Sequence, residues 1–349
     1  MEQSIARRRL KEYLEGTTVG RNWLVPLAVE VRRKIRYTRA ELDNARLWYS
    51  TISKKEFIND LKTAIETRTG YAAAKTGISQ KHWMYYEILL AKERNADERK
   101  SFERQLHYHC LNLEGIFPAR LDFYLEFNRW YVEHVRKLDC LGIYYEWPPL
   151  QLDILKYYKF KTTKTIHYIN QEPDRSSPSN EKNCYLQYFR NKKVLLICPY
   201  AELLRERATK DIFEGVWAKT RKKWFYPKQV DALEFPYGFT TDAQRRYPTV
   251  LQLFEDIKTE IDKRDFDIAL VGAAGLAVPI VSHIKGMCKI AIDLGGHLQV
   301  LFGVMGERWR RREDWKKQYF NDYWIDMPAR YRPKEIDAGI RGRDLDHYW

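Results

Sequence analysis

The chain has 349 residues, of which 44% are apolar and 31% charged, and its formal net charge is +14. This composition is typical of a soluble globular protein with one large domain or two smaller ones. No apolar run reaches the roughly 18 residues that a membrane-spanning helix needs, and the first residues lack the pattern of a secretory signal. We therefore expect neither an integral membrane protein nor a secreted one.

The excess of basic residues calls for an anionic partner, such as nucleic acid, an anionic membrane surface or a phosphorylated small molecule. Three short basic runs, Arg7–Arg9, Arg32–Lys34 and Arg310–Arg312, lie far apart in the sequence. They match no nucleic-acid-binding module, so we expect no nucleic-acid partner. Peripheral contact with a membrane stays open as an alternative, although the charge is not confined to one face.

Five cysteines occur singly, without any pair at metal-ligand spacing. They are Cys110, Cys140, Cys184, Cys198 and Cys288. An odd and unclustered set favours a reducing compartment over a disulfide framework. We expect structural thiols in a cytoplasmic protein.

The composition and the sequence pattern change along the chain. Residues 1–65 are basic and mostly helical in pattern. Residues 66–190 are aromatic and irregular, and they end in a turn-rich stretch at 171–183. Residues 192–305 alternate between apolar runs and helical patterns. The expected units are a basic helical N-terminal region at 1–65, a main domain at 66–325 and a C-terminal tail at 326–349.

The alternating part predicts a strand–helix series. The expected strands are Lys193–Cys198, Val230–Phe235, Asp267–Gly272 and Lys289–Leu294. The expected helices are Ala201–Thr220, Thr249–Lys263, Leu276–Lys285 and His297–Val304. Strands that are apolar throughout need cover on both faces, which helices between them supply. The pattern predicts an α/β fold with a Rossmann-like, mostly parallel sheet flanked by helices and an N-terminal helical extension.

Ligands of such sheets bind beyond the carboxyl ends of the strands. Here those ends carry Pro199-Tyr200, Pro236-Tyr237, Gly272–Gly275 and Gly295-Gly296. The glycines allow backbone N–H groups at a helix start to approach a phosphate closely. They equally allow a tight strand-to-helix turn without any ligand, and both interpretations stay open. Because Ala274 interrupts the dinucleotide-binding glycine pattern, we expect no dinucleotide cofactor.

Polar side chains follow the second glycine turn. His297 and Gln299 lie in the first turn of the expected helix, where they can bind a ligand or cap the helix. Farther on, Arg308 offers a guanidinium for a diphosphate, and Trp309 offers an indole for stacking. The alternative for this pair is a surface salt bridge beside a packed indole.

Candidate general bases are the carboxylates near expected strand ends and turns, namely Glu146, Glu172, Asp293 and Glu114. Carboxylates are common, so position alone does not identify the base. The chain has no phosphate-binding P-loop, no Gly-x-Ser-x-Gly elbow and no His-Glu-x-x-His zinc motif. Kinases and hydrolases of those types therefore have no support.

A block of motifs in the second half indicates a family. Phe266–Gly275 is followed by Pro279 and His283–Lys285, and the pattern continues through Ala291–Gly303 and Gly306–Trp309. These motifs resemble the GT-D-type glycosyltransferases, and residues 291–309 are the most specific part. Weaker similarities, over about residues 56–325, are at Asn112–Pro118, Gln171–Pro173, Val194–Tyr200 and Asn321–Trp324.

The resemblance implies transfer of a sugar from a nucleoside-diphosphate sugar, with a UDP-sugar as first choice, to a hydroxyl of a glycan or glycoconjugate. The residues expected to bind the donor are Lys75, Gly77, Gln80, Pro199, Tyr200, Gly272, Ala273, Gly275, Gly295, Gly296, Gln299 and Arg308. The glycine turns, with Lys75 and Arg308, are expected to stabilise the leaving diphosphate. Glu172 first, and Glu114 second, are expected to take the acceptor proton.

The chain departs from this family at one motif. The family carries an Arg-x-Gly-Asp-Gly-Glu motif whose acidic pair is thought to serve a metal and the sugar nucleotide. The best match is Lys75–Gln80, in which Ile78 and Gln80 replace both acids. An apolar side chain cannot bind a hard cation, and an amide oxygen is a weaker ligand than a carboxylate. A role for Mn²⁺ or Mg²⁺ is left open, and we assign no metal ligands.

Two other functions stay open. The missing acidic pair is compatible with an inactive scaffold that binds nucleotide sugars. The Rossmann-like pattern is also compatible with an S-adenosylmethionine-dependent methyltransferase. In that class the glycine-rich loop follows the first strand, whereas Pro199-Tyr200 follows the first clear strand here.

Overall fold

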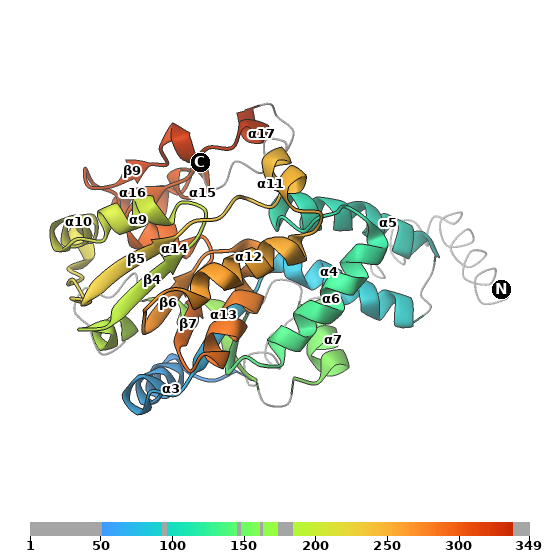
Figure 1. The fold of residues 1–349 in the computed structure, drawn as a ribbon, viewed down its shortest axis with the longest axis horizontal. Coiled ribbons are helices and arrows are strands. Elements are labelled where there is room, and N and C mark those ends of the chain that lie inside the picture. The colour runs from blue at the N-terminus through green and yellow to red at the C-terminus, as the bar shows by residue number, and fades with distance from the viewer. Residues whose placement is uncertain (1–50, 93–95, 145–147, 161–162, 174–183, 338–349) are drawn as a thin grey trace, which may run out of the picture.

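A computed structural model describes residues 51–92, 96–144, 148–160, 163–173 and 184–337 (Figure 1). Most of the expected N-terminal helical region, Glu146, most of the turn-rich stretch and the last residues of the tail lie outside these ranges. Within them, none of the helices combines the length and the apolar character needed to cross a bilayer.

The centre of the fold is a seven-stranded, fully parallel sheet, which confirms the predicted α/β class. Its strands are β1 (Tyr71–Thr76), β2 (Cys140–Ile143), β3 (Lys164–His167), β4 (Lys193–Ile197), β5 (Gln229–Leu233), β6 (Ile268–Val271) and β7 (Ile290–Asp293). The spatial order is β3-β2-β1-β7-β6-β4-β5. β1 and β7 therefore lie at the centre and join the strands of the first half of the chain to those of the second.

Helices cover both faces of the sheet. One face packs against α4 (Ile78–Ala91), α6 (Leu121–Val135), α7 (Pro148–Tyr158), α12 (Val250–Asp262) and α13 (Ala277–Gly286). The other packs against α3 (Lys54–Thr67), α9 (Ala201–Arg207), α10 (Lys210–Val216), α14 (His297–Leu301) and α16 (Glu313–Gln318). The described residues also form the helices α5 (Ala96–His107), the π-helix η2 (Tyr108–Leu113), α8 (Tyr168–Gln171), α11 (Thr241–Arg246), α15 (Glu307–Arg310) and α17 (Lys334–Asp337). Short 3₁₀ helices occur at η4 (Tyr185–Phe189), η5 (Ala218–Thr220), η6 (Ala274–Leu276) and η7 (Ala329–Tyr331).

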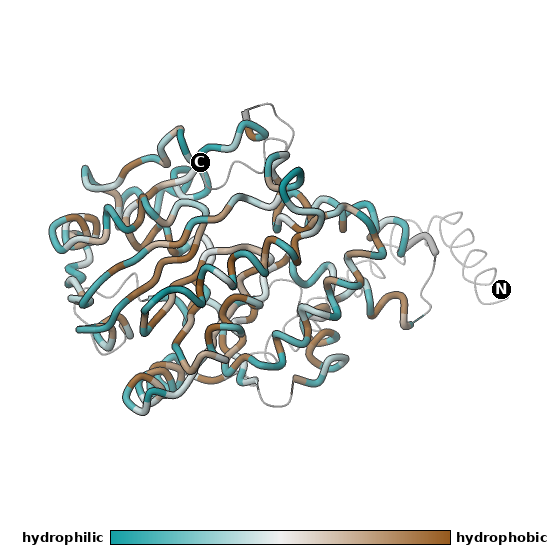
Figure 2. Tube along the Cα trace, in the orientation of Figure 1, coloured by the Kyte–Doolittle hydropathy of each residue, from teal (hydrophilic) through white to brown (hydrophobic). Residues whose placement is uncertain are grey.

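The burial of the strands shows why two helical layers are needed. In β4, Leu195 and Ile197 belong to the core on one face, and Val194 and Leu196 belong to the core on the other. Successive side chains of a strand point to opposite faces, so an apolar run must be covered twice. Figure 2 shows hydrophobic residues along the strands and hydrophilic ones on outer helices such as α5.

The irregularity expected for residues 66–190 is wrong, because this region supplies β1, β2 and β3. β1 reads YAAAKT, in which small residues and a lysine hide the apolar pattern of a buried strand. β3, at the edge of the sheet, buries little beyond Ile166. The expected helix Ala201–Thr220 is also divided. Thr209 caps a new helix there by accepting a hydrogen bond from the Ile212 N–H.

Both expected domain boundaries fall within packed structure. α3 extends to Thr67, and its Phe57 and Leu61 are fully buried in the core. At the other end, β8 (Val304–Met305) pairs with β9 (Ile325–Asp326), and Met327 belongs to the same core. Residues 51–65 and 326–327 are thus part of the domain that holds the sheet.

Candidate functional site

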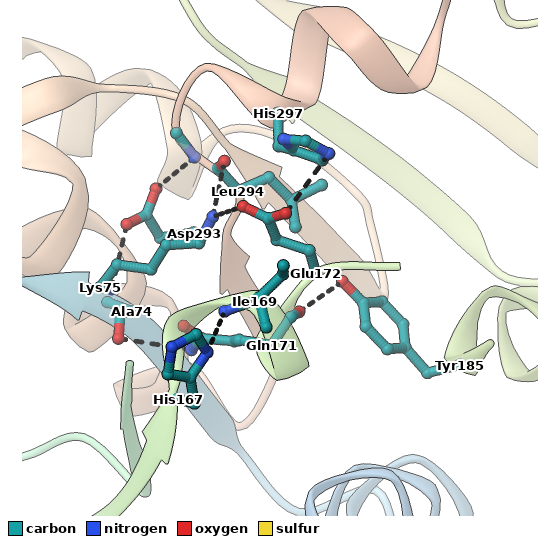
Figure 3. Close-up of polar contacts among 11 residues, drawn as sticks. Ala74, Lys75, His167, Ile169, Gln171, Glu172, Tyr185, Asp293, Leu294 and His297 are labelled. Atoms are coloured by element: carbon teal, nitrogen blue, oxygen red, sulfur yellow. Dashed lines mark hydrogen bonds and ion pairs between the residues drawn. The ribbon is translucent and has the colours of Figure 1, made fainter. Parts of the chain in front are cut away.

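A buried lysine lies at the carboxyl end of β1, in the middle of the sheet (Figure 3). The Nζ atom of Lys75 donates to Glu172 Oε1 at 2.8 Å and to the Leu294 carbonyl oxygen at 3.0 Å. Lys75 and Glu172 are only 7% and 4% exposed. An ammonium has three N–H donors, and these contacts use two of them. Counting only contacts between described residues, one N–H donor of Lys75 is left for a ligand at this edge.

Glu172 owes its position to the residue before it. The Gln171 side chain donates to the Ala74 carbonyl oxygen at 3.3 Å, and Tyr185 donates to the Gln171 carbonyl oxygen at 3.1 Å. On β2, Gly142 faces Lys75 in register. A Cβ atom there would lie 2.3 Å from Gln171 Oε1 and 3.1 Å from Lys75 Cγ. The absence of a side chain at Gly142 therefore leaves room for the side chains of Gln171 and Lys75 at the edge of the sheet.

A second carboxylate, Asp293, ties β7 to β1. Its oxygens accept the Lys75 backbone N–H at 3.2 Å and the Gly295 N–H at 2.8 Å (Figure 3). Burial raises the pKa of Asp293 above its ordinary value, while the Lys75 charge and these two N–H groups oppose the rise. Gly295 has φ +53°, a conformation that favours glycine. Asp293 thus fixes the turn that follows β7.

The two glycine turns lie side by side, as the sequence predicts. A Cβ atom on Gly272 would be 3.0 Å from the Gly295 carbonyl oxygen. The Gly275 N–H donates to the Glu114 carbonyl oxygen at 3.3 Å, and a Cβ atom on Gly275 would be 2.4 Å from Ile116 Cδ1. The second glycine is thus required by packing against the segment that carries Glu114.

The positions of the family's acidic pair do not fit a hard cation. Ile78 is 37% exposed, and Gln80 donates from Nε2 to Glu114 Oε2 at 2.8 Å. Glu114, the second candidate base, is therefore held by this amide. Gln80 Oε1 and Thr76 Oγ1 are buried and have no hydrogen-bond partner among the described residues. Across those residues, no group of three or more His, Cys, Asp or Glu side chains could hold a metal ion.

The other predicted donor-binding residues take different places. Tyr200 and Gln299 are buried and joined by a 3.0 Å hydrogen bond from the tyrosine hydroxyl to Gln299 Oε1. This bond connects the end of β4, with Pro199, to α14. Arg308 is exposed on α15, with its guanidinium 6.0 Å from the Trp309 ring. Gly77 is the N-cap residue of α4, which has no side-chain cap.

The remaining donor-binding predictions lie within the glycine turns. Ala273 is buried directly after Gly272, and Gly296 directly precedes α14. Both places agree with the turns that the sequence predicts.

Two residues of the cluster, Asp293 and His297, are candidates in the sequence but are not among the residues expected to bind the donor or to take the acceptor proton. His297 Nε2 lies 3.4 Å from Glu172 Oε2, and its side chain is 10% exposed. The sequence places His297 in the first turn after Gly296. It gives no sign that residue 172 faces it, because 125 positions separate the two residues. A contact of this kind emerges only when β3 and β7 enter the same sheet.

Together, these contacts build a site on the carboxyl edge of the sheet. Glycine-containing turns follow β6 and β7. Beside them, the Lys75 ammonium binds Glu172, and the Lys75 backbone N–H binds Asp293. Such a site can bind an anion through N–H groups and accept a proton on a carboxylate. Comparisons of the chain with protein-family models, with curated proteins and with solved structures find no match.

Proposed function

We propose that this chain is a cytoplasmic glycosyltransferase that moves a sugar from a nucleoside-diphosphate sugar to an acceptor hydroxyl. The observation that carries the proposal is the buried Lys75–Glu172 pair, at 2.8 Å, beside the glycine turns after β6 and β7. The resemblance of residues 291–309 to GT-D-type glycosyltransferases supports the same reaction. Five cysteines without a disulfide support the compartment.

The donor diphosphate is assigned to the glycine-turn side of the edge. Negative charge develops on the diphosphate as the bond to the sugar breaks, and N–H groups and cations placed there in advance stabilise it. The Gly272, Gly275 and Gly295 N–H groups already bond to Ile197, Glu114 and Asp293. The diphosphate is therefore assigned to the other N–H groups of the two turns, those of Ala273, Ala274 and Gly296, and Lys75 supplies a positive charge. Arg308 is exposed, so it approaches the donor from the solvent side.

The acceptor proton is assigned to Glu172. Its carboxylate is buried and positioned by Gln171, and Lys75 stabilises its negative charge. Glu114 is less suitable, because the Gln80 amide already binds one of its oxygens. The acceptor oxygen bonds to the anomeric carbon, the proton moves to Glu172, and the diphosphate leaves with the electron pair.

The first test is binding. Thermal shifts are measured with UDP, GDP, dTDP and CMP sugars, each with and without Mn²⁺. A ligand at 100 times its dissociation constant adds about 2.7 kcal/mol to the free energy of unfolding, which is readily detected. We expect one nucleotide to stabilise the chain without metal. Stabilisation only with Mn²⁺ contradicts a metal-independent site, and S-adenosylmethionine as the sole ligand contradicts glycosyl transfer.

The second test separates donor binding from chemistry. We expect Glu172→Gln to bind the donor and to lower transfer by about a hundredfold or more. Arg308→Ala should weaken donor binding, whereas the matched control Arg311→Ala, also exposed near α15, should not. Full transfer by Glu172→Gln contradicts the role given to that carboxylate.

An inactive nucleotide-sugar-binding scaffold is the second candidate. The specific observation in its favour is that Ile78 and Gln80 stand where the family has two acids, and that Gln80 is bound to Glu114. Donor binding with no transfer to a broad acceptor panel, with and without Mn²⁺, distinguishes the scaffold from the enzyme.

A further inference from the structure

Glu172 has a different partner on each of its two oxygens. Oε1 receives the Lys75 ammonium at 2.8 Å, and Oε2 lies 3.4 Å from His297 Nε2 (Figure 3). Lysine is a permanent cation near neutral pH, whereas histidine gains and loses a proton there. The carboxylate therefore lies between a fixed charge and a group that can take up a proton.

The surroundings of the cluster favour one additional proton. Among the described residues of the cluster, the Lys75 ammonium binds the Glu172 carboxylate, and its charge also acts on the buried Asp293 carboxylate. Buried negative charge in excess favours proton uptake by a neighbouring group. Other polar and charged side chains lie around the cluster and interact electrostatically with its members or with one another. They are Tyr144, Tyr168, His167, Tyr185 and Arg308.

The placement of His297 suits a group that exchanges protons with water. It occupies the first position of α14, directly after Gly296, and the ring packs edge-on to Trp315 with the ring centres 6.1 Å apart. Its side chain keeps 10% exposure, compared with 5% for Glu172. The imidazole as a whole is thus slightly more exposed than the carboxylate it faces, while its Nε2 atom, which faces that carboxylate, is buried.

We propose that His297 removes the proton that Glu172 takes from the acceptor, and so restores the base for the next transfer. This inference rests on the proposed function. The acceptor hydroxyl gives its proton to Glu172, and Glu172 passes a proton from Oε2 to the buried His297 Nε2. The imidazolium that forms then loses a proton to solvent and returns to the neutral ring. An imidazole is ordinarily a stronger base than a carboxylate, and this favours the second step. His297 acts through Glu172 and does not touch the substrate.

The coupling is tested on the full chain without any ligand. NMR follows the ring resonances of His297 against pH in the wild type and in Glu172→Gln. Removing the facing charge should lower the midpoint of the His297 titration by about 1 pH unit. Glu172→Asp keeps the negative charge but moves it farther from the His297 ring, so the midpoint of the His297 titration should lie between those of the other two proteins.

His283 provides the matched control, because it pairs with Asp262 at 2.7 Å outside the site. Its ring resonances should be unchanged in Glu172→Gln, which also shows that the variant is folded. An unchanged His297 midpoint in both Glu172 variants overturns the proposal.

The relay itself is tested by turnover. With the donor found by thermal shift, His297→Gln should lower kcat by about tenfold or more near neutral pH and leave the KM for the donor unchanged. Added imidazole should restore part of the rate, which a purely structural role does not predict. Transfer by His297→Gln at the wild-type rate overturns the relay, whereas absence of any nucleotide-sugar binding overturns the proposed function and leaves the NMR result standing.

Discussion

The two sides of the carboxyl edge are built in different ways. After β6 and β7, the chain presents backbone groups, and glycines make this possible because Gly295 has φ +53° and Gly272 lies against the Gly295 carbonyl. Between β1 and β3, it presents charged side chains, Lys75 and Glu172, held by contacts between distant segments. The first side depends on local backbone geometry, and the second depends on pairing across the sheet. The glycine turns can thus be found in a sequence by their residue types, whereas the pairing of Lys75 with Glu172 cannot.

The largest effect on stability is expected when the positive charge of Lys75 is removed. Lys75→Met leaves Glu172 and Asp293 buried without their cation, and we expect a loss of about 3–5 kcal/mol in the free energy of unfolding. Lys285→Met is the control, because the Lys285–Asp139 pair is 2.7 Å long but 30% and 32% exposed. Its loss should be about 0–1 kcal/mol. Urea unfolding measures both, and equal losses contradict the buried character of the Lys75 cluster.

The glycine side is tested by adding a single methyl group. Gly275→Ala places a Cβ atom 2.4 Å from Ile116 Cδ1 and 3.0 Å from the Glu114 carbonyl oxygen. We expect a loss of about 1–3 kcal/mol, measured by urea unfolding. Gly286→Ala is the control, because nothing lies within 4 Å of its Cβ position. If both variants are equally stable, the close approach at Gly275 is not a constraint.

A smaller effect on stability is expected from the protonation of two stacked histidines, His82 and His109. His82 on α4 stacks on His109 with ring centres 3.6 Å apart. Burial lowers the pKa of His82, and burial with the His82 charge lowers the pKa of His109 to about 4. The neutral rings therefore favour the folded state above about pH 6.5. That stability is lost as the pH falls toward 4, because the unfolded chain binds the protons first.

His109→Phe tests this expectation, since it keeps an aromatic ring against His82 and removes one titrating group. The fall in Tm between pH 7 and pH 5 should be smaller than in the wild type. His107→Phe, at an exposed position of α5, should leave the fall unchanged. A fall of the same size in all three proteins argues against the buried pair as its source.

The second half of the fold could be predicted because its strands are uniform apolar runs. Lys193–Cys198, Asp267–Gly272 and Lys289–Leu294 match β4, β6 and β7 closely. The first half could not, because half of β1 is alanine and β3 lies at an edge, so neither carries the apolar run of a buried strand. The break at Thr209 was missed as well, since good helix formers continue on both sides of it.

The predicted site residues divide in a similar way. The adjacency of Gly272 and Gly295 follows from their place after neighbouring strands. The internal bond between Tyr200 and Gln299, and the hold of Gln80 on Glu114, could not be foreseen. Each of these pairs depends on the packing of separate segments, which sequence spacing does not encode.

The sequence by itself determined the class of the fold, the position of its later strands along the chain and the position of its glycine turns. These follow from local properties, namely apolar runs that need two-sided cover and residues that tolerate tight backbone. Only the tertiary structure decided that β1 lies beside β7, because strand order depends on packing over the whole chain. That one pairing brings Lys75 to Asp293 and Glu172 to His297, and so creates the buried charges of the site.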